Sequence, residues 1–273
     1  MNMNSQSGRR SEGAAASYRF LKWSIDMWLI LCSPYDQSGV WAYHGLKLRS
    51  REPVELVTTE MLACAVRFEH RVGTDGSSLN IELADGRTIS SRNVKGTVNR
   101  VLQVPDIFAG SPDRDYATQE LTALLMSLLY CLPGLVLNPP TPQGLSGRWR
   151  HPSEWAVLAH GCGLATRTYS QSSRSPDNGA YWQNWGSSNR MQSAIVLGHR
   201  VFPRSLPAGL ADGCRTLAAV SETPLLGLDF VQTDEGGWIF AGASPCPDFV
   251  SAGEEFLDGL AEELGSNQKE VAA

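Results

Sequence analysis

The chain has 273 residues, and its hydrophobic fraction of 42% is ordinary for a globular protein that buries a sizeable core. Its formal net charge of −5 provides no basic surface, so we expect no nucleic-acid partner. Because the six cysteines show no CxxC spacing, and we find neither a secretory signal nor an apolar run of about 20 residues, we predict a cytoplasmic protein without a membrane partner.

The N-terminal part of the sequence predicts a tail followed by an α/β segment. Residues 1–25 are rich in Ser, Gly, Asn and Ala without periodicity, so we predict a flexible tail. The apolar run MWLILC, the helical pattern VWAYHGLKLRS and the strand pattern VELVTTEML then predict a strand, helix, strand unit, which favours a parallel sheet. RFEHRV and SLNIELADGRTIS predict a hairpin-rich segment with a turn at Asp85–Gly86, and KGTVNRVLQVP predicts a buried strand.

A long helix is predicted next. The leucines of DYATQELTALLMSLLYCL recur at helical spacing from position 121 to 129, and Asp115 suits the positive end of the helix dipole. The helix is expected to stop at Pro133–Gly134, and LVLNPP predicts a short strand. We therefore predict a first α/β domain over residues 26–140.

Residues 141–265 predict a second, α+β segment, followed by a C-terminal tail over 266–273. PSEWAVLAHGCGL predicts a short helix, GEEFLDGLAEEL predicts an amphipathic helix, and strands are predicted in ATRTYS, SAIVLGHRVFP, LLGLDFVQT and GGWIFAGA. The polar segment 171–190 carries three large aromatic side chains, Tyr181, Trp182 and Trp185. Exposed aromatic side chains are costly unless they cover a core or meet a partner, so these three are candidate partner contacts.

Two polar clusters in this segment are candidates for other chemistry. Arg148 and Arg150 flank Trp149, a combination that can bind an acidic peptide or a phosphate; a solvated loop is the alternative interpretation. The cluster His160-Gly161-Cys162 contains metal-ligand residue types. No second ligand pair is near it in the sequence, so we interpret it as a helix end with a packed thiol.

The order of elements over residues 26–262 resembles the ATP-grasp ligases, in particular the ribosomal-protein glutamate ligases and the microviridin-type peptide maturases. GTVNRV resembles the family strand that ends in an aromatic residue or Asn followed by Arg, which makes Asn99 and Arg100 candidate contacts to a substrate or partner. LVLNPP resembles the family's W-V-N-P-P. WRHPSEWAVLAHGCGLATRT resembles the helix leading to G-L-x-x-P-x-T, with Thr168 as the final Thr, and AIVLGHRVFP resembles V-V-G-x-x-V-F-A.

The segment GLDFVQTDEGGWIFAGASPCPDF resembles the family strand pair that ends in E-x-N-P-x-P. In the family, E-x-N supplies two oxygen ligands to a Mg²⁺ ion that bridges the ATP phosphates. Here Gly242 stands at the Glu position and Ser244 at the Asn position, while Asp229 matches the acidic residue of the preceding strand. Asp229 is thus a weak Mg²⁺ candidate with Ser244 beside it; the alternative is a strand-end carboxylate with a local hydrogen bond.

Two further departures from the family concern ATP. The lysines stand at positions 22, 47, 95 and 269 only, so the phosphate-binding lysines of the family have no counterpart between residues 96 and 268. The segment from Thr168 to Ala194 is also too short for the family's central lobe. The resemblance therefore implies an α/β fold in which a pre-ATP-grasp-like domain with a parallel sheet precedes a truncated α+β ATP-grasp remnant, and we expect no metal, no cofactor and no catalytic residue.

Three functional interpretations follow. The first is a non-catalytic binding or scaffolding partner in peptide or protein modification, such as RiPP biosynthesis, that binds a peptide or an active ligase, and it leaves a homo- or heterodimer open. The second is an ATP- and Mg²⁺-dependent carboxylate-amine ligase with an unusual site built from Asp229 and the arginines Arg148, Arg150, Arg190 and Arg200. In the third, a partner chain supplies the missing lobe. ATP and Mg²⁺ are expected only under the second and third.

Overall fold

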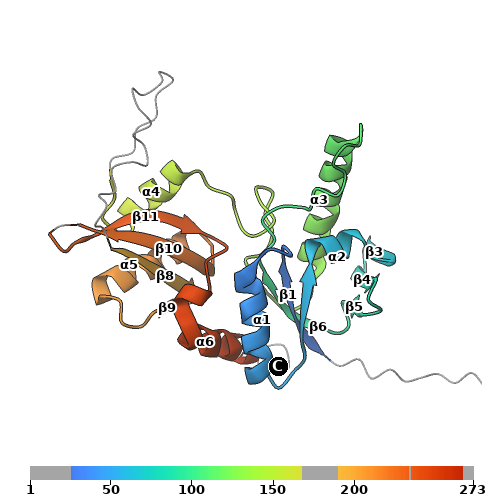
Figure 1. Ribbon diagram of the computed structural model, residues 1–273, viewed down its shortest axis with the longest axis horizontal. Coiled ribbons are helices and arrows are strands. Elements are labelled where there is room, and N and C mark those ends of the chain that lie inside the picture. Colours follow the sequence, from blue (N-terminus) through green and yellow to red (C-terminus); the bar gives the residue numbers. More distant parts are fainter. Residues whose placement is uncertain (1–25, 168–189, 234, 267–273) are drawn as a thin grey trace, which may run out of the picture.

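The structure, a computed structural model, describes residues 26–167, 190–233 and 235–266. Its elements in chain order are β1 (Met27–Cys32), α1 (Gln37–Arg49), β2 (Val54–Thr58), α2 (Thr59–Ala63), β3 (Arg67–Gly73), β4 (Gly76–Glu82), β5 (Thr88–Ser90), β6 (Val94–Asn99), α3 (Arg114–Cys131), β7 (Leu135–Leu137), α4 (Pro152–Gly161), β8 (Met191–Leu197), β9 (Arg200–Phe202), α5 (Ala208–Val220), β10 (Leu225–Gln232), β11 (Trp238–Ser244), the 3₁₀ turn η1 (Val250–Ala252) and α6 (Gly253–Ser266). These elements form two lobes, with α6 between them beside α1 (Figure 1).

The first lobe is built on a parallel sheet with strand order β2-β1-β6-β7, which confirms the predicted parallel sheet. All six residues of β1 are buried because helices cover both faces of the sheet. Trp28 and Ile30 pack on the side of α1, whereas Leu29 and Leu31 pack on the side of α3. Four of the five leucines predicted from helical spacing, Leu121, Leu125, Leu128 and Leu129, meet this second face, whereas Leu124 is exposed.

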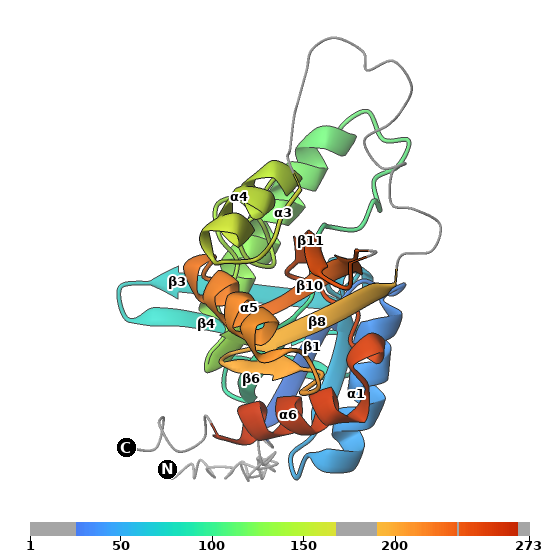
Figure 2. The same ribbon diagram turned by 90° about the vertical axis from the view of Figure 1, so that its left-hand side faces the viewer.

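A three-stranded antiparallel sheet, β3-β4-β5, adjoins the α3 side of the first lobe (Figure 2). The Asp85–Gly86 turn joins β4 to β5 as predicted, and Gly86 adopts a φ of 85°, which a residue with a side chain rarely adopts. The inward side chains of β4, Leu79 and Ile81, join the core formed under α3. The hairpin prediction is therefore confirmed.

The second lobe is an antiparallel sheet of order β11-β10-β8-β9, with α4 and α5 on one face. Helix α5 was not predicted, because its sequence AGLADGCRTLAAV contains two glycines and its start carries no capping side chain. It forms because tertiary burial of Cys214 and Leu217 against the sheet outweighs this weak propensity. The strand predicted in ATRTYS appears within the described residues as one bridge between Thr166 and Phe240.

Helix α6 completes a core shared by both lobes. Phe256 and Leu257 pack in one cluster with Phe202 of the second lobe and Leu46 of the first. The approach of α1 to α6 requires Gly45, since a Cβ atom there would lie 2.3 Å from Leu257 Cδ1. Within the described ranges, no helix combines the length and apolar character needed to cross a bilayer.

Candidate functional site

The first candidate site is the strand position that the family resemblance assigns to Mg²⁺. Asp229 lies on β10 between Ser193 of β8 and Gly242 of β11, and its exposed carboxylate accepts a 2.6 Å hydrogen bond from Ser193 Oγ. A Cβ atom added at Gly242 would meet no heavy atom within 4 Å, so the position beside Asp229 is open space. Asp229 and Gly242, which the resemblance places at two family ligand positions, therefore lie side by side, and Asp229 carries the one carboxylate of the two.

The donor set around Asp229 does not fit Mg²⁺. Ser244 Oγ accepts a 3.1 Å hydrogen bond from the Cys246 backbone N–H, so this hydroxyl stabilises the turn after β11. Among residues 26–167, 190–233 and 235–266, no three His, Cys, Asp or Glu side chains gather in a way that could hold a metal ion. A hard divalent cation needs several oxygen ligands in near-octahedral array, and one carboxylate does not provide them.

The arginines considered for an unusual ATP site do not converge on Asp229. Arg200 pairs with Leu197 at the far end of β8, about 13 Å along the strand from Ser193 at ~3.3 Å per residue, and its guanidinium binds two carboxylates of α6. Arg190 directly precedes β8, is exposed, and accepts a backbone hydrogen bond from Gln232. The Arg190 backbone bonds to Gln232, three residues or about 10 Å along the strand from Asp229, so neither arginine lies directly beside this carboxylate.

Arg148 and Arg150 meet at the start of α4 around one carboxylate. The Arg150 guanidinium is buried 5.3 Å from the Trp155 ring centre, and its Nε lies 3.4 Å from Glu154 Oε1. Arg148 Nη2 lies 3.7 Å from the same oxygen. Glu154 thus occupies the place that an acidic ligand would take between the two arginines, while Trp149 beside them is 65% exposed.

Asn99 and Arg100, the other predicted contact residues, are buried where the two lobes meet. Asn99 Nδ2 donates to the carbonyls of Asn138 and Leu145, at 2.8 and 2.7 Å. Arg100 donates through Nε and Nη2 to the Asp36 carboxylate and through Nη1 to the Pro247 carbonyl. Both side chains therefore have intramolecular partners, and a substrate would have to displace these partners to contact them.

Buried thiols lie beside this junction and in the second lobe. Burial raises the pKa of the Cys32 thiol to about 12, and the nearby Asp36 carboxylate adds to this shift. Burial likewise raises the pKa of Cys214 to about 12. Cys32 and Cys214 are free and buried, whereas Cys64 is free and exposed.

These thiols predict a loss of stability at high pH. The unfolded chain ionises a thiol near pH 8.5, whereas the native state keeps Cys32 and Cys214 protonated until about pH 12. The free energy of unfolding should therefore fall by about 1.4 kcal/mol per pH unit for each thiol above roughly pH 9, as urea titrations would measure. Cys214→Ala should make the slope shallower and Cys64→Ser should not. Equal slopes in all three proteins would contradict the assignment.

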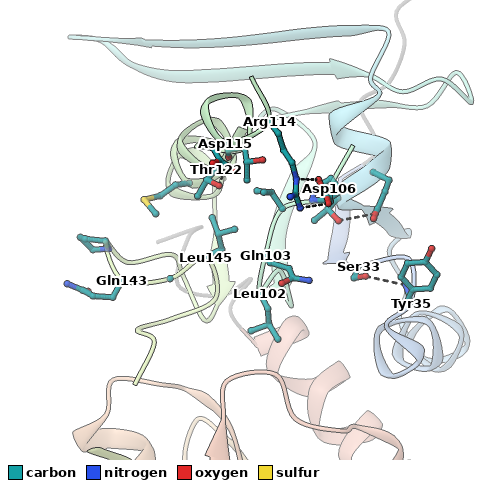
Figure 3. Close-up of a pocket in the computed structure, with 18 residues that line it drawn as sticks. Ser33, Tyr35, Leu102, Gln103, Asp106, Arg114, Asp115, Thr122, Gln143 and Leu145 are labelled. Atoms are coloured by element: carbon teal, nitrogen blue, oxygen red, sulfur yellow. Dashed lines mark hydrogen bonds and ion pairs between the residues drawn. The ribbon is translucent and has the colours of Figure 1, made fainter. Parts of the chain in front are cut away.

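A pocket of about 850 Å³ opens at the carboxyl ends of the parallel strands in the first lobe (Figure 3). Its walls come from the loops after β1, β6 and β7, from α2, and from α3 between Arg114 and Met126. The charged residues in its lining are Glu60, Asp106, Arg114 and Asp115. Arg114 is bound to Asp106 by two hydrogen bonds of 2.9 and 2.6 Å, which leaves the other two carboxylates without a cation in the lining.

No sequence motif points to this pocket. Its lining comes from five segments spread over residues 33–145, and no local motif joins them. In the folded sheet, β2 lies on one side of β1 and β6 on the other, so the loops after β1 and β6 diverge at the sheet edge where open α/β sheets bind ligands. The remaining predicted contacts, Tyr181, Trp182 and Trp185, and the family-motif Thr168, lie outside the described residues.

Comparison with known proteins identifies the fold. No protein-family model and no curated protein matches the sequence. Among solved structures, the chain is similar to macrocyclase MdnC of Microcystis aeruginosa MRC bound with precursor peptide MdnA, with a TM-score of 0.66, 13% identity, and 88% of this chain and 99% of that one covered. Macrocyclase MdnB of the same organism gives a TM-score of 0.67 at 13% identity, with the same coverage.

A third similar structure is the RiPP-associated ATP-grasp ligase of Chryseobacterium gregarium in complex with ADP and a leader and core peptide. It matches with a TM-score of 0.65 and 10% identity over 89% of this chain and 97% of that one. The chain therefore has an ATP-grasp-like fold, as the sequence resemblance implied.

Proposed function

We propose that the chain is a non-catalytic binding or scaffolding partner in peptide or protein modification, built on an ATP-grasp-like fold without an intact Mg-ATP site. The observation that carries this proposal is the open position at Gly242, which leaves Asp229 as a lone carboxylate at the point where the resemblance expects two metal ligands. A lone exposed carboxylate binds a divalent cation weakly.

Three positively charged side chains of the described residues support the same proposal. Lys95 is paired with Glu52 in the first lobe, and Lys47 contacts Tyr43 on α1. Arg200, at the far end of β8, is held by the carboxylates of α6. None of these described cations lies beside Asp229, where the β- and γ-phosphates of ATP would need point charges.

A peptide or protein is the proposed partner, and an active ligase is one such protein. The similar structures include a macrocyclase bound with its precursor peptide and a ligase in complex with a leader and core peptide, which supports a peptide for this fold. Tyr181, Trp182 and Trp185 remain the proposed aromatic contacts on sequence grounds. Deleting residues 171–190 should weaken capture of a peptide or protein partner, and unchanged capture would remove this segment from the proposal.

The first test is calorimetric titration of the whole protein with ATP and Mg²⁺, which should give no saturable heat up to millimolar nucleotide. Installing the absent ligands by Gly242→Glu with Ser244→Asn should create divalent-ion binding, because the added carboxylate would stand directly opposite Asp229. We expect Mn²⁺ to bind the double variant about tenfold tighter than the parent, a difference of ~1.4 kcal/mol, measured by water-proton relaxation.

The matched control is Gly242→Gln with Ser244→Asn, which adds the same volume without the charge. This variant should bind Mn²⁺ no better than the parent protein. Equal gains in both double variants would mean that the effect is not ligation by a carboxylate. Saturable Mg-ATP binding by the parent protein would overturn the proposal itself.

The alternative is an ATP-dependent carboxylate-amine ligase with an unusual site or with a lobe from a partner chain. One observation favours it: Asp229 is still exposed at the centre of the sheet, positioned by Ser193. Under this alternative, ATP-dependent coupling of a peptide carboxylate to an amine would be abolished by Asp229→Ala. Activity that survives this substitution would exclude Asp229 as the metal ligand.

A further inference from the structure

The pocket lies at the carboxyl ends of the parallel strands, beside the loop residues through which the first lobe contacts the second. α1 covers one face of the parallel sheet and packs against α6, whereas α3 and the β3-β4-β5 sheet cover the other. The pocket is lined by α3 residues Arg114, Asp115, Thr118, Thr122 and Met126, so it lies toward the α3 side. It shares no lining residue with the strands that carry Asp229.

The lining combines an apolar surface with uncompensated negative charge. Leu102 is 61% exposed and Tyr35 is 88% exposed at the pocket, and the buried Leu145 lies deeper in its wall (Figure 3). Exposed apolar side chains that surround a cavity mark a binding surface more often than isolated ones do. The volume of about 850 Å³ falls within the range of about 300–1,000 Å³ that ligand pockets occupy.

The charged side chains of the lining favour a ligand of positive charge. The Asp106 and Arg114 side chains neutralise each other through their two hydrogen bonds, which are visible in Figure 3. Glu60 receives one hydrogen bond, from the uncharged Thr59 hydroxyl, and Asp115 lies in the first turn of α3. The lining therefore carries an excess of two carboxylates and would attract a cation while repelling a carboxylate or phosphate.

We propose that this pocket binds a basic peptide segment, in which a Lys or Arg side chain reaches Glu60 and Asp115 while neighbouring apolar side chains cover Leu102 and Tyr35. The long aliphatic stem of either basic residue suits a site with an apolar wall and a charged rim. The proposal rests on the proposed function for one point only, namely that the partner is a peptide. It needs neither nucleotide nor metal.

The test is selection from a random heptapeptide library displayed on phage, followed by calorimetry with a selected peptide synthesised with acetylated and amidated ends. We expect enrichment of peptides with Lys or Arg next to apolar residues. The variant Glu60→Gln with Asp115→Asn should lower the affinity for the selected peptide about fivefold or more, because two partly exposed charge pairs are lost. The affinity of the parent protein should also fall as salt rises.

Two further variants keep the result interpretable. Glu120→Gln changes a charge on α3 outside the pocket lining and should leave the affinity unchanged. Thr118→Arg places a bulky cation in the pocket wall and should lower the affinity for the peptide more than about tenfold. Arginine is well tolerated in a helix, so the Tm of this variant should not fall.

Three outcomes would overturn the proposal: selection of acidic peptides, no enrichment over the library, or full affinity in Thr118→Arg. Its failure is distinct from failure of the proposed function, because peptide binding and Mg-ATP titration are measured separately. Saturable Mg-ATP binding together with pocket-dependent peptide binding would overturn the non-catalytic proposal and leave the peptide site standing.

Discussion

Replacing Arg100 with alanine is expected to lower the free energy of unfolding by about 3–5 kcal/mol, because it leaves the partly buried Asp36 carboxylate, which is 16% exposed, without its cation. The Arg100 side chain is 4% exposed, donates to Asp36 and to the Pro247 carbonyl, and lies 4.1 Å from the Phe249 ring centre. It thereby connects the loops after β1 and β6 to the segment after β11. Urea unfolding followed by tryptophan fluorescence would measure the loss.

The matched control for Arg100 is Arg114→Ala. Arg114 also makes two hydrogen bonds to one carboxylate, Asp106, but both side chains are about half exposed. Solvent and salt screen such a pair, so its removal should cost at most about 1 kcal/mol. A similar small cost for Arg100→Ala would mean that the two lobes do not depend on this ion pair.

Replacing Asn138 with alanine is expected to cost about 3–4 kcal/mol. This fully buried side chain donates from Nδ2 to the carbonyls of Leu225 and Pro245, at 2.6 and 2.7 Å, and accepts from the Leu225 backbone N–H at 3.1 Å. These backbone groups, two of them on the buried Leu225 and one on the partly buried Pro245, would lose this partner, at about 1–3 kcal/mol per group before relaxation. Asn138 also adopts a φ of 57°, which costs alanine roughly 1 kcal/mol.

Asn138→Gly separates the two contributions. Glycine adopts the left-handed conformation without strain but makes no side-chain hydrogen bond, so it should recover about 1 kcal/mol of the alanine loss. The same urea titration measures both variants. If glycine restored the parental stability, the hydrogen bonds to Leu225 and Pro245 would contribute nothing, contrary to the prediction.

The sequence motif around Asn138 does not reveal the hydrogen bonds that this side chain makes. LVLNPP predicts a short strand closed by prolines, and β7 is present at Leu135–Leu137. The partners of Asn138, however, lie 87 and 107 residues away in the sequence. A contact over such a distance depends on how the two lobes pack and leaves no local pattern.

The sequence by itself determined most strands of both lobes and the helices with regular apolar spacing. These features depend on local periodicity, which burial on one or two faces of an element imposes directly. The strand predicted in VELVTTEML was wrong in its second half, because Thr58 caps helix α2 over Thr59–Ala63. Helix α5 escaped prediction because its two glycines weaken the local signal, and burial against the sheet of the second lobe compensates for them.

Only the tertiary structure decided what the predicted contact residues do. Asn99 and Arg100 carry functional groups that suit a substrate, yet the folded first lobe gives them internal partners, and Pro247 from the segment after β11 adds one more to Arg100. The pocket beside α3 forms because the strand order β2-β1-β6-β7 sends the loops after β1 and β6 in opposite directions, which separates them at the edge of the sheet. Local pattern determines each element, whereas strand order and lobe packing determine which side chains meet.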